Sequence, residues 1–176
     1  MTWVVFLRGA NVGGHRKFQP KKFAEGMGEL GVTSIGAAGT FLVRTELSAE
    51  SVHDAFKRRL SFETETMICP ADEIVGLVRS NPFGVGPLRE GVRGFVSVLA
   101  SPPRVLPKVP IEQPRGNDWE VRVLRITNRY VFSLRRRRGE RTIYPNEVVE
   151  SKLGVKATTR GWETILSVHK ILNTSS

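Results

Sequence analysis

The order of short apolar runs and amphipathic segments in the first 80 residues constrains the fold most. Residues 2–8, 32–43 and 65–69 are rich in the β-branched and aromatic residues of strands. Between and after them, segments that start at Pro20, Ala49 and Ala71 carry apolar residues at helical spacing. This order, β-α-β(β)-α-β-α, predicts a ferredoxin-like layer, with helices on one face of a small, mostly antiparallel sheet.

Turn and capping residues set the expected element boundaries. Pro20 suits the first turn of a helix that carries Phe23, Met27 and Leu30 on one stripe, and Gly31 suits its C′ position. Ser48 is a suitable N-cap for a helix over residues 49–60. The glycines of residues 36–40 divide the second apolar run into two short strands or produce a bulge.

Residues 80–94 interrupt this pattern with prolines, glycines and asparagine, which predicts a boundary. A second set of elements follows: a strand at 95–99, an irregular or extended proline-rich stretch at 100–114, a hairpin at 119–134 and a helix at 145–153 are expected. Thr159 is expected to cap a last helix whose buried stripe holds Trp162, Ile165, Leu166, His169 and Leu172. The predicted class is α+β: a ferredoxin-like domain at 1–80, a boundary at 81–94 and a second, smaller α+β subdomain at 95–176.

The charge balance favours anionic partners. The chain of 176 residues has 27 Lys and Arg against 17 Asp and Glu, a formal net charge of +10. Such a surplus suits nucleic acid or an anionic small molecule, although a genome that encodes arginine freely would produce the same composition. No apolar run is long enough to span a bilayer, and the N-terminus lacks the pattern of a secretory signal. With Cys69 alone, no intrachain disulfide is possible, so we expect a cytoplasmic protein without membrane association.

The first candidate site is the loop that follows the first strand. Glycines allow backbone N–H groups to approach an anion, and successive N–H groups form a nest. The spacing matches neither a P-loop nor a dinucleotide-binding fingerprint. A long turn whose glycines only supply positive φ is the structural alternative. If the loop binds an anion, the residues expected to bind it are Arg8, Gly9, Asn11, Gly13 and Gly14.

Two further candidates lie in the second half of the chain. Thr158, Thr159 and Arg160 would form an anion cradle at a helix N-terminus, although capping and a core position for Trp162 explain the same residues. The run Arg135, Arg136, Arg137 and Arg138 is expected at a hairpin tip, either as a solvated loop or as a group of phosphate contacts for nucleic acid.

Signatures of catalysis, metal binding and cofactor binding are missing from the sequence. The three histidines lie far apart, and neither a zinc-protease motif nor a nucleophile elbow is present. We therefore predict no catalytic residue, no metal ligand and no cofactor, and the sequence leaves the oligomeric state open.

Three blocks of the chain resemble the signatures of the bacterial DUF1697 family. They are LRGANVGG at 7–14, NPF at 81–83 and TTRGWET at 158–164. The resemblance implies two α+β parts and no defined activity. The chain differs from the family pattern at Ala38 and Thr40, where relatives carry Ser-Gly-Asn, and at Gly161 and Glu163, where they carry asparagines. We expect the first and last blocks to share one cationic pocket. Two functions stay open: a noncatalytic polyanion-binding or nucleic-acid-binding module, and a protein or enzyme that binds a phosphorylated or carboxylated metabolite.

Overall fold

The computed structural model describes residues 1–10, 18–140 and 142–174. The protein is of the α+β class, with two antiparallel sheets and, in the described residues, five α-helices. It forms two compact units: residues 1–80 together with the C-terminal residues from Leu166 on, and residues 81–165. The C-terminal residues from Leu166 on are thus grouped with the first unit.

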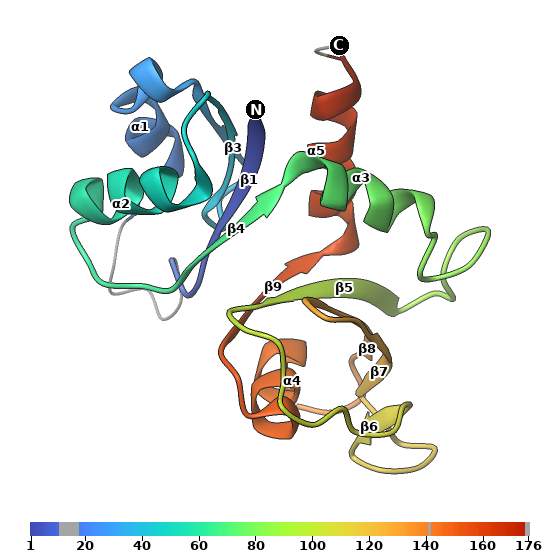
Figure 1. Ribbon diagram of the computed structural model, residues 1–176. Coiled ribbons are helices and arrows are strands. Elements are labelled where there is room, and N and C mark those ends of the chain that lie inside the picture. The colour runs from blue at the N-terminus through green and yellow to red at the C-terminus, as the bar shows by residue number, and fades with distance from the viewer. Residues whose placement is uncertain (11–17, 141, 175–176) are drawn as a thin grey trace. The chain divides into compact units, whose positions relative to one another are not determined.

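The sheet of the first unit has the strand order β2-β3-β1-β4, and all neighbours are antiparallel (Figure 1). These strands are β1 (Thr2–Leu7), β2 (Val32–Ile35), β3 (Thr40–Arg44) and β4 (Thr66–Pro70). Helices α1 (Pro20–Glu25) and α2 (Ala49–Arg59) cover one face, and α3 (Ala71–Arg79) contacts β1 and β4. The core below α1 and α2 includes fully buried Phe41 and Phe56.

Local sequence explains most of these boundaries. The Ser51 N–H donates to Oγ of Ser48 over 3.2 Å, which confirms the predicted N-cap of α2. The predicted helix from Pro20 to Leu30 is wrong in length: α1 ends at Glu25, and a 3₁₀ turn, η1 (Gly28–Leu30), follows. Two glycines, Gly26 and Gly28, lower the helix propensity at this break.

The sheet of the second unit has the order β6-β7-β8-β5-β9, again with antiparallel neighbours (Figure 1). Its strands are β5 (Val92–Leu99), β6 (Ile111–Gln113), β7 (Val121–Ile126), β8 (Tyr130–Arg136) and β9 (Ala157–Gly161). Helix α4 (Pro145–Leu153) packs on one face through Val148, Val149 and Leu153. Strand β6 lies in the proline-rich stretch that was expected to be irregular or extended.

The prediction that Thr159 caps the last helix is wrong. Residues Ala157–Gly161 form the edge strand β9, paired with β5, and α5 (Trp162–Thr174) starts directly after it. The β-branched pair Thr158 and Thr159 suits a strand as well as a cap, and the long-range pairing decides between them. The predicted stripe of α5 is wrong in part: Ile165 is buried as expected, but Leu166 is 41% exposed and Val168 is buried instead.

Aromatic packing in the second unit joins two of the family blocks. The ring of Phe83 meets Trp162 edge-on, with centroids 5.2 Å apart, and meets Phe132 at 6.3 Å. A Cβ at Gly94 would lie 2.9 Å from Cε2 of Phe83, so the glycine makes room for this ring. The NPF block and the tryptophan of the last block therefore have a structural role in packing.

Candidate anion-binding surface

Strand β8 places the first two of the four consecutive arginines on opposite faces. It extends to Arg136, so the prediction that the run forms a hairpin tip is wrong for its first half. The reason is pairing that local sequence cannot show: Val92 and Arg93 of β5 lie opposite Arg136 and Arg135. Successive strand residues point to opposite faces, so Arg135 and Arg136 have different surroundings, while Arg137 and Arg138 follow the end of the strand.

The even-numbered arginines hold the segment before β7. Nε of Arg136 donates to the carbonyl oxygen of Trp119 over 2.6 Å, and its Nη2 donates to that of Asn117. The guanidinium carbon of Arg136 lies 4.1 Å from the centre of the Trp119 ring. Arg138 forms a 2.6 Å ion pair with Asp118. Both side chains thus make contacts within the unit, and their assignment to nucleic-acid contacts stays a prediction.

A second arginine completes the packing around Trp119. The guanidinium carbon of Arg122 lies 4.3 Å from the same ring, and Nη2 of Arg122 forms a 2.7 Å ion pair with Glu112. The pKa of Glu112 is lowered, first by the hydrogen bond that Gly116 N–H donates and then by Arg122 and Arg136. The buried tryptophan thus sits among cations whose charge is partly balanced by one carboxylate.

The odd-numbered side of the run carries a cationic surface without such balance. Arg93 and Arg135 are direct partners across β5 and β8, so their side chains share a face. The guanidinium carbon of Arg135 lies 5.2 Å from the ring centre of Tyr144, whose side chain is 52% exposed. Among the described residues, no carboxylate forms an ion pair with Arg93, Arg135 or the exposed Arg137. We call Arg93, Arg135, Arg137 and Tyr144 the arginine–tyrosine patch.

Hydroxyl groups occupy the same face of the sheet, next to the patch. Ser133, two residues before Arg135, is fully buried, and its Oγ has no hydrogen-bond partner among the described residues. Further along the face, Oγ of Ser97 lies 2.7 Å from Oγ1 of Thr159, which donates to Oδ1 of Asn146 over 2.8 Å. Asn146 belongs to the first turn of α4, which Tyr144 precedes without a side-chain cap.

The net positive charge of the chain is concentrated in the second unit. Residues 81–165 hold 16 Lys and Arg and 8 Asp and Glu, so they contribute +8 of the total of +10. The remaining residues hold 11 and 9, or +2. The anion attraction inferred from composition therefore belongs mainly to the unit that carries the arginine–tyrosine patch.

The predicted cradle at Thr158, Thr159 and Arg160 lies on strand β9 instead of at a helix N-terminus. Arg160 is buried, and its Nη1 donates to Oγ1 of Thr158 over 2.8 Å and to the carbonyl oxygen of Thr159 over 3.0 Å. Burial lowers the pKa of Arg160 to about 10. Strand alternation separates Thr158 and Arg160 from Thr159, whose hydroxyl bonds Ser97 and Asn146 on the α4 face.

The glycine loop is described only at its start. The Arg8 N–H donates to the carbonyl oxygen of Glu65 over 2.9 Å, and Gly9 has a φ of 66°. Asn11, Gly13 and Gly14 lie outside the described residues. Arg8 and Gly9 belong to the first unit and Arg160 to the second, so the expected shared pocket stays a prediction.

The start of the loop packs against the turn between β2 and β3. Leu7 N–H donates to the carbonyl oxygen of Gly39 over 2.8 Å. Gly39 has a φ of 74°, and a Cβ there would lie 2.9 Å from Cβ of Ala10. Glycine is required at this position because both the backbone conformation and the close approach exclude a side chain. The departures at Ala38 and Thr40 flank this glycine and leave it in place.

Two members of the arginine–tyrosine patch, Arg93 and Tyr144, were missed from the sequence. Arg93 stands in the stretch expected to be an irregular boundary, and only the register of β5 against β8 brings it to Arg135. For Tyr144 the signal was its position before Pro145, which begins α4.

In the described part of the chain, no group of three or more His, Cys, Asp or Glu side chains could hold a metal ion. None of the helices described there is long and apolar enough to cross a bilayer.

Comparisons with known proteins agree with the resemblance seen in the sequence. A family model described as "Protein of unknown function (DUF1697)" matches residues 1–132. The fold is similar to that of a solved structure, the conserved bacterial protein SP0830 from Streptococcus pneumoniae, with a TM-score of 0.60. That match has 13% sequence identity and covers 97% of this chain and 98% of the other. No curated protein matches the chain.

Proposed function

The chain belongs to the DUF1697 family, for which no activity is described, and from this premise we propose that it is a noncatalytic module that binds the phosphate backbone of nucleic acids. The second unit would supply the contacts, through the arginine–tyrosine patch. Arg93, Arg135 and Arg137 would contact phosphate oxygens, and Tyr144 would stack on a base or sugar.

The observation that carries this proposal is the pairing of Arg93 with Arg135. Like charges directly opposite each other on neighbouring strands destabilise a sheet. Elsewhere in the unit, Arg122 and Arg138 are each balanced by a carboxylate. A phosphate group between Arg93 and Arg135 would remove the repulsion, because two guanidinium groups can donate to one anion.

The surroundings of the patch also support a phosphate ligand. On the same face, Oγ of Ser133 is buried without a partner among the described residues. Helix α4 begins beside Tyr144, and a helix N-terminus favours anions through its free N–H groups. The net charge of +8 on this unit would steer a polyanion toward it.

We also propose that the first unit is a ferredoxin-like layer. Its elements follow the order β1-α1-β2-β3-α2-β4, and β3 lies between β1 and β2 in the sheet. This order supports the proposal, because a split βαβ layer has the same arrangement. Sheets of this kind also serve as RNA-binding platforms, which agrees with the proposed class of ligand.

The test is the salt dependence of oligonucleotide binding. Fluorescently labelled single-stranded RNA and duplex DNA would be titrated with the protein at several salt concentrations. If Arg93, Arg135 and Arg137 each contact one phosphate, replacing all three with Ser should reduce the slope of log K against log salt. The expected reduction is about 2 to 3 units, since each contact contributes roughly 0.9 on duplex and 0.7 on single strands.

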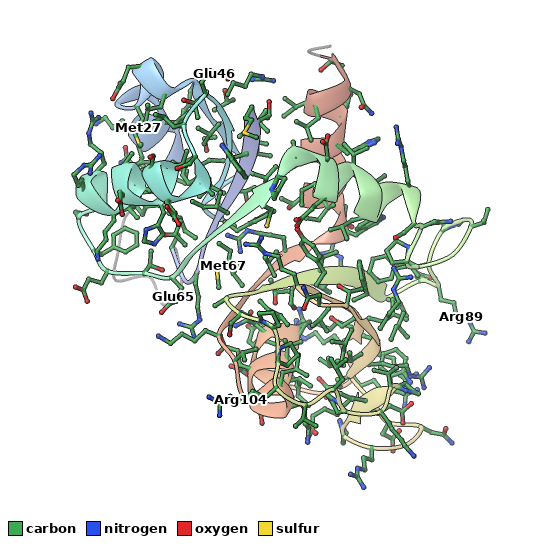
Figure 2. The ribbon with its side chains drawn as sticks, viewed as in Figure 1. Met27, Glu46, Glu65, Met67, Arg89 and Arg104 are labelled. Carbon is green, nitrogen blue, oxygen red and sulfur yellow. The ribbon has the colours of Figure 1, made fainter. Side chains whose placement is uncertain are left out.

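A matched control separates local contacts from net charge. Arg89, Arg104 and Lys108 are exposed residues of the same unit outside its strands, and Arg89 and Arg104 are labelled in Figure 2. Replacing these three with Ser removes the same charge and should leave the slope nearly unchanged. Equal flattening in both triple variants would contradict a defined patch. If the wild type binds no oligonucleotide even at low salt, the nucleic-acid function is excluded, and the alternative of a small anionic ligand would be preferred.

A further inference from the structure

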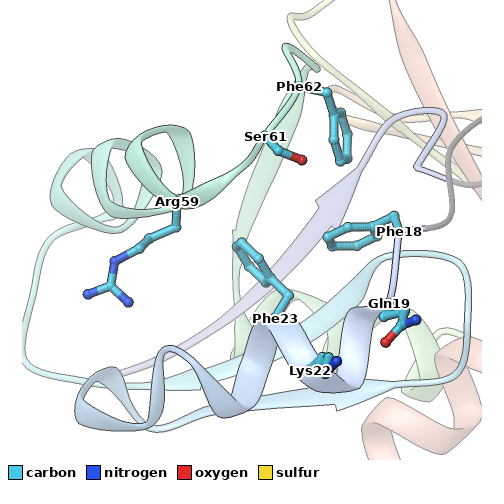
Figure 3. Close-up of a pocket in the computed structure, with 7 residues that line it drawn as sticks. All are labelled: Phe18, Gln19, Lys22, Phe23, Arg59, Ser61 and Phe62. Atoms are coloured by element: carbon cyan, nitrogen blue, oxygen red, sulfur yellow. The ribbon is translucent and has the colours of Figure 1, made fainter.

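The first unit contains an aromatic pocket that is separate from the arginine–tyrosine patch. Its volume is about 690 Å³, and it lies between α1, the residue pair before it, and the end of α2 with the segment that follows (Figure 3). This volume falls within the range of about 300 to 1,000 Å³ that is typical of small-molecule sites. The pocket is lined by Phe18, Gln19, Lys22, Phe23, Arg59, Ser61 and Phe62.

The walls of the pocket are rings held by the core. Phe18 meets Phe62 edge-on at a centroid distance of 5.3 Å and meets Phe23 at 5.5 Å. Phe23 packs on Phe41 at 5.5 Å and on Phe56 at 5.4 Å, and the rings of Phe41 and Phe56 are fully buried. A continuous row of rings therefore runs from the core to the surface, so the pocket walls are positioned before any ligand arrives.

The three rings that face the pocket are only partly buried. Phe18, Phe23 and Phe62 are of intermediate exposure, although each could bury more apolar surface. Leaving large apolar surface in contact with water is unfavourable by roughly 25 cal/mol per Å². Figure 3 shows the three rings grouped together around the pocket. A flat apolar or aromatic group placed among them would cover this surface.

Among the described residues that line the pocket, Lys22 is the available cation. Arg59 is engaged, since its Nη2 forms a 2.8 Å ion pair with Glu29 and its Nη1 donates to the carbonyl oxygen of Gly26. In Figure 3 its guanidinium points away from the rings. Lys22 is exposed on α1 and forms no ion pair among the described residues. Gln19 and Ser61 add neutral polar groups to the lining.

We propose that this pocket binds a planar aromatic ring that carries an anionic group, of the chemical class of a nucleoside monophosphate. The ring stacks among Phe18, Phe23 and Phe62, and Lys22 contacts the anion. Base–aromatic stacking accepts any base because every base has a π-face. The polar groups of Gln19 and Ser61 are available to its hydrogen-bonding edge. This inference does not depend on the proposed function of the second unit.

Calorimetric titration with the four common ribonucleoside 5′-monophosphates tests the proposal. Ribose 5-phosphate supplies the anion without the ring, and the unphosphorylated nucleosides supply the ring without the anion. Both should bind more weakly than the monophosphates, ribose 5-phosphate by a factor of about 5 to 150, which is the contribution of stacking one base. Ribose 5-phosphate or nucleosides that bind as tightly as the monophosphates would contradict the two-part site, as would absence of monophosphate binding at millimolar concentrations.

Variants locate the binding. Phe62→Ala and Lys22→Gln should each weaken monophosphate binding about tenfold, while Lys21→Gln, an exposed neighbour on α1 outside the pocket lining, should not. Since Phe62 follows α2 and its ring meets Phe18 at the surface end of the ring row, circular dichroism should show an intact fold. Unchanged affinity in both Phe62→Ala and Lys22→Gln would overturn the assignment. The Arg93, Arg135 and Arg137 triple variant should keep full monophosphate affinity, so failure of the proposed function and failure of this one are distinguishable.

Discussion

Substituting Gly94 with Ala should destabilise the second unit, because the added methyl group would collide with a ring that is held in place. The new Cβ would lie 2.9, 3.0 and 3.1 Å from three ring atoms of Phe83. Contacts this short require something to move. The ring is held at 5.2 Å by Trp162 and at 6.3 Å by Phe132. Strand β5 cannot yield easily either, because it is paired on both sides, with β8 and β9.

The magnitude follows from overpacking. An extra methyl group in a packed core costs about 1 to 3 kcal/mol. For a unit of this size, each kcal/mol lowers the melting temperature by roughly 4 to 8 °C. We therefore expect the unfolding transition of the second unit to move down by at least about 4 °C, measured by calorimetry and by urea denaturation.

A control and a second-site variant make the experiment decisive. Gly76 lies in helix α3 with no atom within 4 Å of an added Cβ, so Gly76→Ala should stabilise the protein by up to about 1 kcal/mol. Replacing Phe83 with Leu should reduce the cost of Gly94→Ala, giving a coupling energy on the order of 1 kcal/mol. An unchanged melting temperature in Gly94→Ala, together with zero coupling to Phe83, would refute the close packing of this ring against β5.

Two further substitutions test the arginines of the second unit. Arg136→Ala removes the hydrogen bonds to Trp119 and Asn117 and the contact with the Trp119 ring. It should therefore lower the melting temperature and speed proteolysis between residues 113 and 119. The control variant Arg137→Ala should change neither the melting temperature nor the proteolysis rate. Burial lowers the pKa of Arg160 from its ordinary, higher value to about 10, so above pH 10 the unfolded chain binds more protons than the folded chain. The stability of the wild type relative to Arg160→Met should therefore rise as the pH increases from about 10 toward 12, and denaturant titrations at pH 9 and 11 that give the same difference would contradict a buried, charged Arg160.

Capping and turn residues in the sequence predicted the element boundaries of the first unit better than those of the second. Ser48, Gly31 and the glycines of residues 36–40 act on the backbone within a few residues, and the structure has a cap, a left-handed C′ glycine and a turn at these places. The second unit depends on pairing between distant segments. Strand β9 was predicted as a helix N-terminus because threonine suits both, and only its pairing with β5 distinguishes them.

The arginine–tyrosine patch also depends on pairing between distant segments, which the sequence does not show. Four arginines in a row are visible in the sequence, but their separation into two faces depends on how far β8 extends. That extension is set by Val92 and Arg93, which stand in a stretch whose prolines and glycines indicated a boundary. The contacts of Trp119 with Arg122 and Arg136 were also beyond prediction, because they join residues up to 17 positions apart.

Because Arg135 and Arg136 lie on opposite faces of β8, this strand should tolerate substitutions better than insertions or deletions. Inserting or deleting one residue between Leu134 and Arg136 would keep the strand's composition but exchange the side chains presented on its two faces. The arginine that holds Trp119 would then point toward α4, and the segment before β7 would lose its anchor. Substitution of Arg135 or Arg137 by other surface residues should preserve the fold. A change in the register of β8 against β5 should not. In homologues, an alignment gap at this point would therefore indicate a larger rearrangement than the loss of an arginine.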